Sequence, residues 1–359
     1  MTMILEKTRP AAVAASKVLI TGGAGFFGSL LARRLLADGR ECVILDLQRT
    51  DIRHPGLTAV QGDIRNRDLV ERLFRTHRFG EVYHCAAMLA HAVKDARFLW
   101  ESNVDGTRNV ADAAARSGVE TLVFTSSNCL WAENLHRLVR EDDTPAPVEV
   151  YGRSKWAGEK VLGEYRDRLN VVSFRCPTII DEGRLGLLAI LFQFIEEGRK
   201  VWVVGGGRNR YQFIYAQDLA AACIAASGHG RSDLFNIGSD DVTSLGDNYR
   251  HVIERAGTGA RVASLPKAPT LAAMRLAHAL KLSPLGPYQY RMIAEDFVFD
   301  TTHIKSKLNW RPTLTNSEML WRAYDYYRQN RREIEARADV SAHRQAAKMG
   351  VIRLLKWMS

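Results

Sequence analysis

Tyr151 and Lys155 are four residues apart, so on a helix both side chains would project from one face toward the same spot. A free tyrosine has a pKa of about 10, and a neighbouring ammonium together with the positive nicotinamide ring of an oxidised cofactor favours the phenolate. Tyr151 would then exchange a proton with a substrate oxygen while the cofactor exchanges a hydride with the carbon. The spacing predicts a catalytic tyrosine-lysine pair, with an ordinary surface pair as the alternative.

A hydroxyl group is expected beside this pair. Residues 121–124 are typical of a buried strand, and the hydroxyl-bearing residues 125–127 follow at its end. Ser127 is the predicted third catalytic residue, because its hydroxyl would hydrogen-bond the same substrate oxygen. Thr125 is the alternative, since it points to the same side of the strand. A polar strand end without a catalytic role is the simpler interpretation.

A glycine-rich turn, Thr21–Gly28, follows the apolar run 18–20 and precedes a helical pattern. Its glycines allow a tight turn and a close approach of backbone to a pyrophosphate, which the helix N-terminus attracts. Asp46 comes eighteen residues after Gly28, where a carboxylate accepts the adenosine ribose hydroxyls. We therefore predict NAD as the cofactor. NADP is less favoured because Asp46 would repel its 2′-phosphate, although Arg49 lies close enough to soften that preference.

Asp63 follows the predicted third strand and would reach the adenine amino group, or else be a solvated turn residue. Strand and helix patterns alternate from residue 17 to 175, which predicts an α/β fold with a doubly wound parallel Rossmann sheet and a smaller C-terminal substrate domain. The expected organisation is a disordered leader (1–16), an NAD-binding domain (17–175, with a return segment near 211–226), a mainly substrate-binding domain (176–335) and a basic amphipathic tail (336–359).

The motifs carry a family resemblance over roughly residues 17 to 330. They are the glycine turn, Asp63, His84-x-Ala86-Ala87, Asn103-Val104-x-Gly106-Thr107, Ser127, Tyr151-x-x-x-Lys155, and later Tyr215-Ala-Gln-Asp218-Leu219-Ala220, Phe235-Asn236-Ile237-Gly238 and Leu308-Asn-Trp310-Arg-Pro312. The chain closely resembles the extended short-chain dehydrogenase/reductases, which include UDP-galactose 4-epimerase, sugar-nucleotide dehydratases and 3β-hydroxysteroid dehydrogenases. The resemblance implies the fold, an NAD(P)-dependent enzyme and the Ser-Tyr-Lys machinery.

The predicted cofactor contacts are Gly22, Gly25, Phe26, Phe27, Gly28, Asp46, Asp63, Ile64, Ala86, Tyr151, Lys155 and Pro177. We interpret His84 and Asn103 as scaffolding of the cofactor site, because neither is needed for the proton or hydride step. Asp218 and Asn236 are interpreted as structural. The five cysteines are widely spaced and form no C-x-x-C pair, so no metal site or disulfide framework is expected.

Family members that act on nucleotide sugars resemble one another in placing an arginine where this chain has Tyr211, with Arg210 displaced by one residue. A second arginine has no counterpart in residues 293–296, so the diphosphate clamp is incomplete. The apolar runs 187–192 and 271–285 instead favour a hydrophobic secondary alcohol or ketone, sterol-like or sphingolipid/ceramide-like, unless they are simply core. The alternatives are a nucleotide-sugar 4-epimerase or dehydratase with tightly bound NAD, and a dinucleotide-sensing regulator.

The net charge of +10 is spread along the chain without a nucleic-acid-binding motif, so no nucleic-acid partner is expected. No apolar run is long enough to span a membrane. In the tail, one helical face would be apolar and the opposite face basic, which suits a peripheral contact with an anionic membrane or a simple docking helix. We expect a cytoplasmic protein, alternatively peripheral at the inner membrane surface. The resemblance also implies a homodimer through apolar surface of Val110, Ala113, Trp156, Ala157 and Val161.

Overall fold

The computed structural model describes residues 16–89, 95–131, 134–184, 186, 188–280, 290 and 292–336. A seven-stranded sheet with the order β10-β6-β5-β4-β1-β2-β3 forms its centre, and every pairing in it is parallel. Its strands are β1 (Lys17–Thr21), β2 (Cys42–Asp46), β3 (Leu57–Gln61), β4 (Phe79–His84), β5 (Thr121–Ser127), β6 (Asn170–Cys176) and β10 (Asp233–Asn236). The predicted α/β class with a doubly wound parallel sheet is confirmed.

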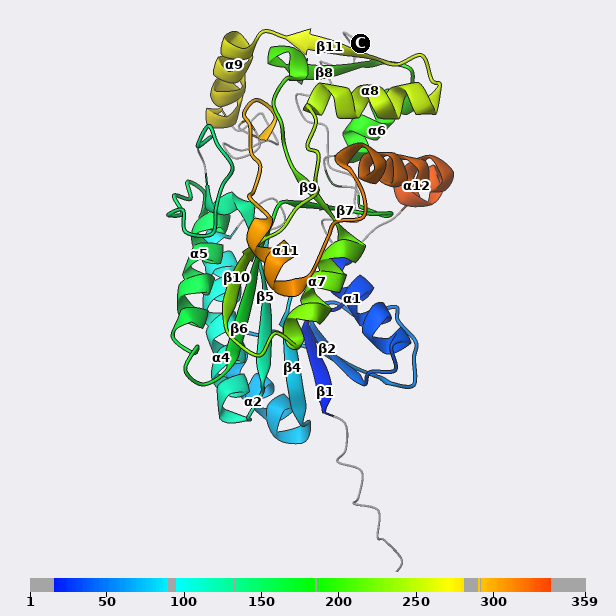
Figure 1. Cartoon of the computed structure of the whole chain (residues 1–359). Helices are drawn as coiled ribbons and strands as arrows, with labels where there is room; N and C mark the ends of the chain where they lie inside the picture. The colour runs from blue at the N-terminus through cyan, green and yellow to red at the C-terminus, as the bar shows by residue number, and fades with distance from the viewer. Residues whose placement is uncertain are drawn as a thin grey trace, which may run out of the picture.

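Helices cover both faces of this sheet, which explains why its central strands are almost continuously apolar and buried. One face packs against α1 (Phe26–Ala37), α7 (Ala216–Ser227) and α11 (Thr302–Leu308). The other face packs against α2 (Arg67–Thr76), α4 (Gly106–Arg116) and α5 (Val150–Gly163), with α3 (Ala96–Trp100) and the π-helix η1 (Glu101–Asp105) beside them. Figure 1 shows these two helical layers on either side of the strands.

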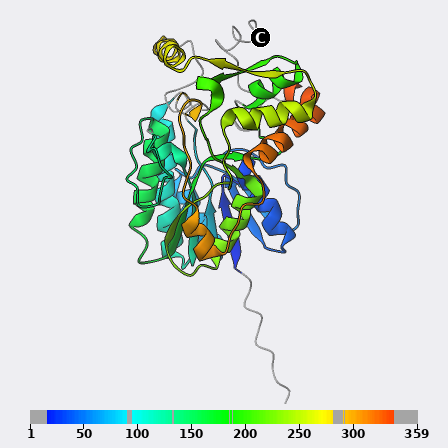
Figure 2. The same ribbon diagram turned by 45° about the horizontal axis from the view of Figure 1, so that its top comes forward.

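A smaller part of the molecule lies beyond the carboxyl ends of the strands (Figure 1). It contains two short parallel sheets, β7 (Thr178–Ile180) with β9 (Phe213–Tyr215) and β8 (Lys200–Val204) with β11 (Arg261–Leu265). Its helices are α6 (Leu188–Glu196), α8 (Leu245–Ala256), α9 (Lys267–Ala279) and α12 (Asn316–Ala336). Helices α8 and α12 lie side by side in both views (Figure 2) and enclose a separate apolar core with α6.

The two parts are interleaved along the chain. Helix α7 follows β9 of the smaller part but packs on α1 and β5, and β10 then joins the edge of the large sheet beside β6. The carboxylate of Asp218 in α7 accepts hydrogen bonds from the backbone N–H and the hydroxyl of Thr313, both at 2.7 Å. The indole of Trp310 donates to the Asp218 carbonyl at 2.9 Å. These contacts fasten the C-terminal segment to the sheet.

The apolar runs that suggested a hydrophobic cleft have other roles. Side chains of α6, including Ile190, Phe192 and Ile195, are buried in the core of the smaller part. Helix α9 has no buried residue, and Leu276 and Leu280 are 62% and 59% exposed. The alternative that the first run is core therefore holds for α6, whereas a cleft lined by these runs stays a prediction. Amphipathic packing accounts for α6 without any ligand.

The predicted dimer surface also needs correction. Val110, Ala113 and Val161 are buried inside the protomer, where α4 and α5 pack on each other and on the sheet. Trp156 and Ala157 alone among the five predicted contacts keep partial exposure. A homodimer through these helices thus stays a prediction that would need other contacts. Within the described residues, no helix combines the length and apolar character needed to cross a bilayer. The leader, except Ser16, and the tail beyond residue 336 lie outside the described residues.

Candidate active site

Strand β5 and helix α5 bring the predicted catalytic residues together. Helix α5 begins at Val150, so Tyr151 lies in its first turn and Lys155 one turn later. Lys155 is 2% exposed and donates from Nζ to the carbonyl of Thr125 at 2.6 Å. Its ammonium also lies 4.4 Å from the centroid of the Phe124 ring. These contacts hold the lysine against the end of β5 beside Ser127.

The electrostatics of the pair follow from burial. Burial raises the pKa of the Tyr151 phenol well above its usual value, while hydrogen bonding from Ser127 acts in the opposite direction. Burial lowers the pKa of Lys155 to about 8, and the nearby Glu159 carboxylate opposes that change. In the protein alone, Tyr151 is therefore a neutral phenol that faces the hydroxyl of Ser127. A positive charge arriving beside the phenol would favour its deprotonation.

Ser127 is held in place by its own backbone surroundings. Its Oγ accepts a hydrogen bond from the N–H of Cys129 at 3.1 Å and caps the short helix η2 (Asn128–Leu130). Thr125, the alternative, uses its carbonyl to accept from Lys155, and its hydroxyl lies 3.4 Å from the carbonyl of His84. Because Thr125 is engaged on both sides, Ser127 is the better placed of the two to bind a substrate oxygen.

A buried ion pair fixes α5 to the sheet behind this site. Glu159 lies two turns after Tyr151. Its carboxylate accepts hydrogen bonds from Nη2 and Nε of Arg175, at 2.9 and 3.1 Å. The hydroxyl of Ser126 donates to the same carboxylate at 2.5 Å. Arg175 also donates to the carbonyl of Glu141 at 2.9 Å and lies 4.9 Å from the Trp131 ring centroid. Sequence reasoning missed this pair, although Glu159 continues the i, i+4 series from Tyr151 and Lys155.

Asn103 connects the same helix to the loop after β4. It lies in the π-helix η1, a conformation that turns a side chain out of the regular helical register and is frequent at functional sites. Its amide accepts from the N–H of Met88 at 2.7 Å and donates to the Met88 carbonyl and to Ser154 Oγ, both at 3.0 Å. Ser154 in turn donates to the carbonyl of Tyr151 at 2.7 Å. The contacts agree with the scaffolding role we assigned to Asn103.

His84 is likewise enclosed by hydrogen bonds. The hydroxyl of Thr107 donates to the carbonyl of Asn103 at 2.8 Å, so His84 Nε2 must donate to Thr107 at 2.8 Å. Its Nδ1 then accepts from Thr21 Oγ1 at 2.6 Å. Burial lowers the pKa of His84 to about 3, so that the imidazole is neutral. This neutral ring joins the start of the glycine turn to α4.

The glycine turn has the shape that a dinucleotide phosphate requires. Gly22 has a φ of +70°, and a Cβ there would lie 2.7 Å from Cα of Ala86. A Cβ on Gly28 would lie 2.2 Å from the Gly22 carbonyl oxygen, so only glycine lets α1 approach the turn. Gly25 immediately precedes α1, which leaves the first backbone N–H groups of the helix directed at the turn. Phe26 and Phe27 are buried at the start of this helix.

Asp46 stands at the end of β2 beside the turn. Its Oδ2 accepts from the N–H of Ala24 at 2.9 Å, and its Oδ1 accepts from the N–H of Gln48 at 2.9 Å. Arg49 donates to the side chain of Gln61 at 3.2 Å. The carboxylate thus lies at the end of β2 beside the glycine turn, its contact with the adenosine ribose stays a prediction, and Arg49 is engaged with the neighbouring strand.

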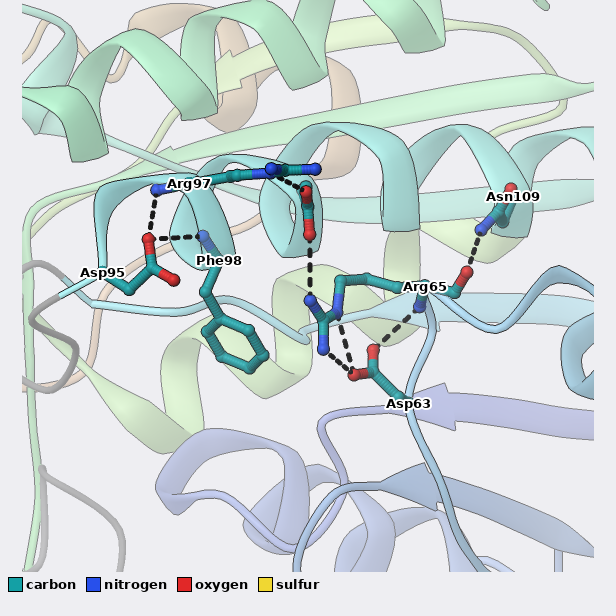
Figure 3. Close-up of polar contacts among 7 residues, drawn as sticks. Asp63, Arg65, Asp95, Arg97, Phe98 and Asn109 are labelled. Carbon is teal, nitrogen blue, oxygen red and sulfur yellow. Dashed lines mark hydrogen bonds and ion pairs between the residues drawn. The ribbon is translucent and has the colours of Figure 1, made fainter.

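Asp63 is part of a charged cluster, shown in Figure 3. Its Oδ2 accepts from Nε and Nη2 of Arg65 at 2.9 and 2.7 Å, and Arg65 Nη1 donates to Glu101 at 3.0 Å. The Arg65 guanidinium stacks 4.1 Å above the centroid of the Phe98 ring. Asp63 therefore lies at the predicted edge of the sheet but is already paired with Arg65, which was not expected from the sequence.

The remaining predicted contacts occupy the same edge of the sheet. Ile64 is buried beneath the Asp63 turn, and its carbonyl accepts from Asn109 at 3.0 Å. The N–H of Ala86 lies 3.3 Å from Thr21 Oγ1. Pro177 is buried between β6 and β7. Among the described residues, no group of His, Cys, Asp and Glu is arranged to hold a metal ion.

Two residues of this region were not predicted from the sequence: Asn128, which follows Ser127, and Arg184, which follows β7. Asn128 donates from Nδ2 to the Tyr211 hydroxyl at 2.7 Å, and that hydroxyl lies 3.4 Å from Thr178 Oγ1. Arg184 interacts electrostatically with both Tyr151 and Tyr211. Nothing in the sequence pattern marks Arg184, because it lies in an irregular segment without periodicity.

Arg210, which we considered as a displaced clamp, faces elsewhere. Its backbone N–H donates to Asp296 at 2.8 Å, and its guanidinium is 3.5 Å from the same carboxylate. It lines a hollow of about 290 Å³ to which none of the predicted catalytic residues contributes. The side chain of Tyr211, by contrast, is 2% exposed and points toward Asn128 and Thr178.

The residues present fit NAD. The two close approaches at Gly22 and Gly28 form a cradle that a Cβ would fill, and the N-terminus of α1 supplies the positive end of the helix dipole for a pyrophosphate. Asp46 offers a carboxylate for ribose hydroxyls at the neighbouring strand end. Tyr151 and Lys155 then lie where a nicotinamide and a substrate would meet, at the carboxyl ends of the strands.

Comparison with known proteins gives consistent matches. A model of the NAD dependent epimerase/dehydratase family matches residues 18–238. The uncharacterized protein y4nG of Sinorhizobium fredii is 36% identical over 341 residues, which is 94% of this chain and 85% of that protein. UDP-glucose 4-epimerase of Mycolicibacterium smegmatis is 28% identical over 334 residues, which is 87% of this chain and 98% of that protein. The crystal structure of the Bordetella bronchiseptica enzyme WbmG in complex with NAD and UDP superposes with a TM-score of 0.73 at 23% identity, covering 87% of this chain and 95% of WbmG.

Proposed function

The chain belongs to the NAD dependent epimerase/dehydratase family, and from that premise we propose that it is a nucleotide-sugar 4-epimerase that keeps its NAD bound. Family membership confirms the predicted resemblance, the enzymatic class and the cofactor NAD. The predicted nucleotide-sugar alternative now fits better than the sterol-like or sphingolipid-like substrate. The 4-epimerase activity and the roles of individual residues are the proposal.

The observation that carries it is the convergence of Ser127, Tyr151 and Lys155 at the end of β5, next to the glycine cradle. Bound NAD supplies the group that takes a hydride from the substrate carbon and returns it. Tyr151 takes the proton of the sugar hydroxyl and later gives it back, while Ser127 hydrogen-bonds the same oxygen. The positive charge of Lys155 favours the phenolate at the moment when Tyr151 must accept a proton.

A dehydratase would need more than this set. Elimination of water from a keto sugar needs an acid that protonates the departing hydroxyl, in addition to Tyr151. The side chains that follow Ser127 are Asn128 and Cys129, and neither is a carboxylic acid. The ionisable groups that most affect Tyr151 are Cys129, Cys176 and Arg184, again without a carboxyl. This arrangement supports epimerisation over dehydration.

The choice of a nucleotide sugar over a lipid rests on two observations. The apolar α6 belongs to the core of the smaller part, and α9 leaves Leu276 and Leu280 exposed, so neither helix argues for a hydrophobic cleft. Ser127 hydrogen-bonds the Tyr151 phenol and Arg184 adds a positive charge, while the polar side chains of Asn128 and Thr178 contact the Tyr211 hydroxyl. A relative named UDP-glucose 4-epimerase matches almost its full length to this chain, which supports the same class.

The deciding experiment incubates the purified protein with UDP-glucose, UDP-galactose or dTDP-glucose and no added cofactor, and follows the sugar by proton NMR. We expect interconversion of 4-epimers, NAD recovered from the denatured protein, and loss of nearly all turnover in Tyr151→Phe. Failure to convert any nucleotide sugar by protein saturated with NAD would contradict the proposal. Stoichiometric consumption of added NAD with a hydrophobic alcohol would restore the lipid interpretation instead.

A further inference from the structure

Helix α9 is exposed along its whole length, because none of its residues is buried. Four of its residues are half-buried at helical spacing and mark the side that faces the protein: Thr270, Leu271, Met274 and Ala277. The centre of the opposite side is exposed and apolar. We call it the α9 strip, and it consists of Ala268, Ala272, Leu276, Ala279 and the C-cap residue Leu280. An ordinary surface helix has the reverse arrangement, with its polar residues toward water.

The strip differs from the scattered apolar residues of an ordinary surface. Leu276 and Leu280 lie one helical turn apart and are the two most exposed large apolar side chains among the described residues. Single exposed apolar residues are normal, whereas a continuous exposed apolar surface marks an interaction site. Ala272 and Ala279 join the two leucines into such a surface. We therefore looked for the chemistry of a partner that would cover the strip.

The charge around α9 is entirely positive in the local sequence. Arg275 is exposed at the border of the strip, and Lys267 at the start of the helix pairs with Glu295 at 2.9 Å. Residues 255–294 contain six lysines and arginines and no aspartate or glutamate. With 40 acidic residues in a chain of 359, about four would be expected in a stretch of this length. The strip is thus part of a cationic segment.

This charge decides between the surfaces that could cover the strip. A second copy of the chain would bring the same cationic segment, and residues 337–359 contain five lysines and arginines against one aspartate, so either would meet like charge. Protein interfaces are also enriched in aromatic residues, which the strip lacks. An anionic lipid surface complements both features, because it attracts basic residues and takes up apolar side chains.

We propose that α9 lies on an anionic lipid bilayer, with Leu276 and Leu280 inserted among the headgroups and Arg275 beside their negative charges. The inference goes beyond the proposed function, because it does not depend on the substrate. Figures 1 and 2 show α9 at the end of the molecule opposite the amino ends of the strands. Contact through α9 turns the end that carries Tyr151 toward the lipid. The membrane contact predicted for the tail is a separate hypothesis.

The test is flotation of the full-length, NAD-saturated protein with vesicles of phosphatidylcholine, either alone or with about 30% phosphatidylglycerol. We expect binding only to the vesicles that contain phosphatidylglycerol. Binding should be weaker at high salt than at low salt, because salt screens the attraction of the basic residues. The readout is lipid binding and not turnover, so the result is independent of the proposed function.

Substitutions separate the apolar contribution from the charge. Leu276→Ser combined with Leu280→Ser removes the inserted surface and keeps the charge, so the partition coefficient should fall about tenfold. Arg275→Gln should lower it about fivefold. The matched controls are Leu138→Ser, at another exposed apolar side chain, and Arg78→Gln, at an exposed arginine immediately before β4. Both controls should float like wild type.

Thermal unfolding shows beforehand that each variant is folded. Wild type that fails to float with phosphatidylglycerol vesicles at low salt would overturn the inference. Equal flotation of wild type and the leucine pair would also overturn it, because the binding would then belong to another surface, such as the tail. If the leucine pair instead turns a dimer into a monomer in light scattering and floats unchanged, α9 contacts a second copy and the lipid assignment is wrong. Should the pair not fold, Leu280→Ser decides alone.

Discussion

Glu159 and Arg175 form a two-point ion pair whose side chains are only 7% and 2% exposed, directly behind the strand end that carries Ser127. Glu159 belongs to the same helix as Tyr151 and Lys155, and Arg175 to β6. The pair therefore joins the helix of the catalytic phenol to the sheet. Because Ser126 also donates to Glu159, the carboxylate connects three elements at one point.

Removal of one partner should destabilise the protein strongly. Glu159→Gln or Arg175→Met leaves a buried charge uncompensated, for which we expect a loss of about 3–5 kcal/mol in the free energy of unfolding. Urea denaturation monitored by circular dichroism measures it. Arg108→Ala is the control, since its ion pair with Glu164 is exposed on the surface and should contribute little. If Arg108→Ala lowered the free energy of unfolding as much as Glu159→Gln or Arg175→Met, the structural role of the buried pair would be refuted.

Replacement of the catalytic phenol should separate chemistry from binding. Tyr151→Phe deletes one hydroxyl and retains the packing of α5, so we expect turnover to fall by about 10²–10⁴-fold with NAD content unchanged. Tyr165→Phe is the control, because Tyr165 lies just beyond the C-terminal end of α5 and its hydroxyl donates to Asp112. Steady-state rates and cofactor analysis give the answer. A Tyr151→Phe protein within a few-fold of wild type would exclude the assigned mechanism.

Cofactor binding should change the titration of Tyr151. Burial raises the pKa of this phenol in the protein alone, and the positive nicotinamide of oxidised NAD should lower it again. Phenolate absorbance near 295 nm should thus appear at a lower pH when oxidised NAD is bound than without it. The difference should vanish in Tyr151→Phe. The same shift in the variant would assign it to another of the eleven tyrosines.

Asp46 should set the choice between NAD and NADP. Its carboxylate stands at the predicted ribose position and would repel a 2′-phosphate, so Asp46→Asn should narrow the preference for NAD by about tenfold, ~1.4 kcal/mol. Fluorescence titrations with the reduced cofactors measure both affinities. Asp51→Asn, which alters an exposed ion pair with Arg33, should leave the ratio unchanged. A wild-type preference for NADP would refute the assignment and direct attention to Arg49.

His84 should make stability depend on pH. The folded protein keeps it neutral because burial lowers its pKa to about 3, whereas the unfolded chain takes up a proton near 6.5. The free energy of unfolding should therefore decrease as the pH falls from 6.5 toward 3. Between pH 7.5 and pH 5 we expect a decrease of about 2 kcal/mol. His84→Asn should flatten that slope in urea denaturation at the two pH values, and the exposed His136→Asn should not. An unchanged slope in His84→Asn would contradict this account.

The fold and most of the site were predictable because they depend on local patterns. A few neighbouring residues suffice to predict the strand or helix that carries the glycine turn, Asp46 and the Tyr151-Lys155 pair. Alternating strands and helices fix a parallel sheet, and the carboxyl ends of parallel strands meet at one edge. The position of Ser127 beside Tyr151 follows from these rules alone.

The features that could not be predicted from the sequence depend on tertiary contacts. Nothing near Glu159 in the sequence indicates that Arg175 will face it, and Arg184 lies in a stretch without periodicity. The apolar α6 could have lined a cleft or filled a core, and only the packing of α8 and α12 decides for the core. Arg65 is only two residues from Asp63, but the direction of its side chain depends on tertiary contacts with Phe98 and Glu101, which the local sequence does not show.

Strand β10 has a consequence for how the molecule is made. It closes the edge of the sheet beside β6, yet it is synthesised only after the whole of α6, β8, β9 and α7. While a ribosome extends the nascent chain, β6 exposes unpaired backbone groups along a hydrophobic edge, and such an edge recruits other strands. Truncation before Asp233 should accordingly yield insoluble protein, and expression that is slowed between β6 and β10 should increase the demand for chaperones.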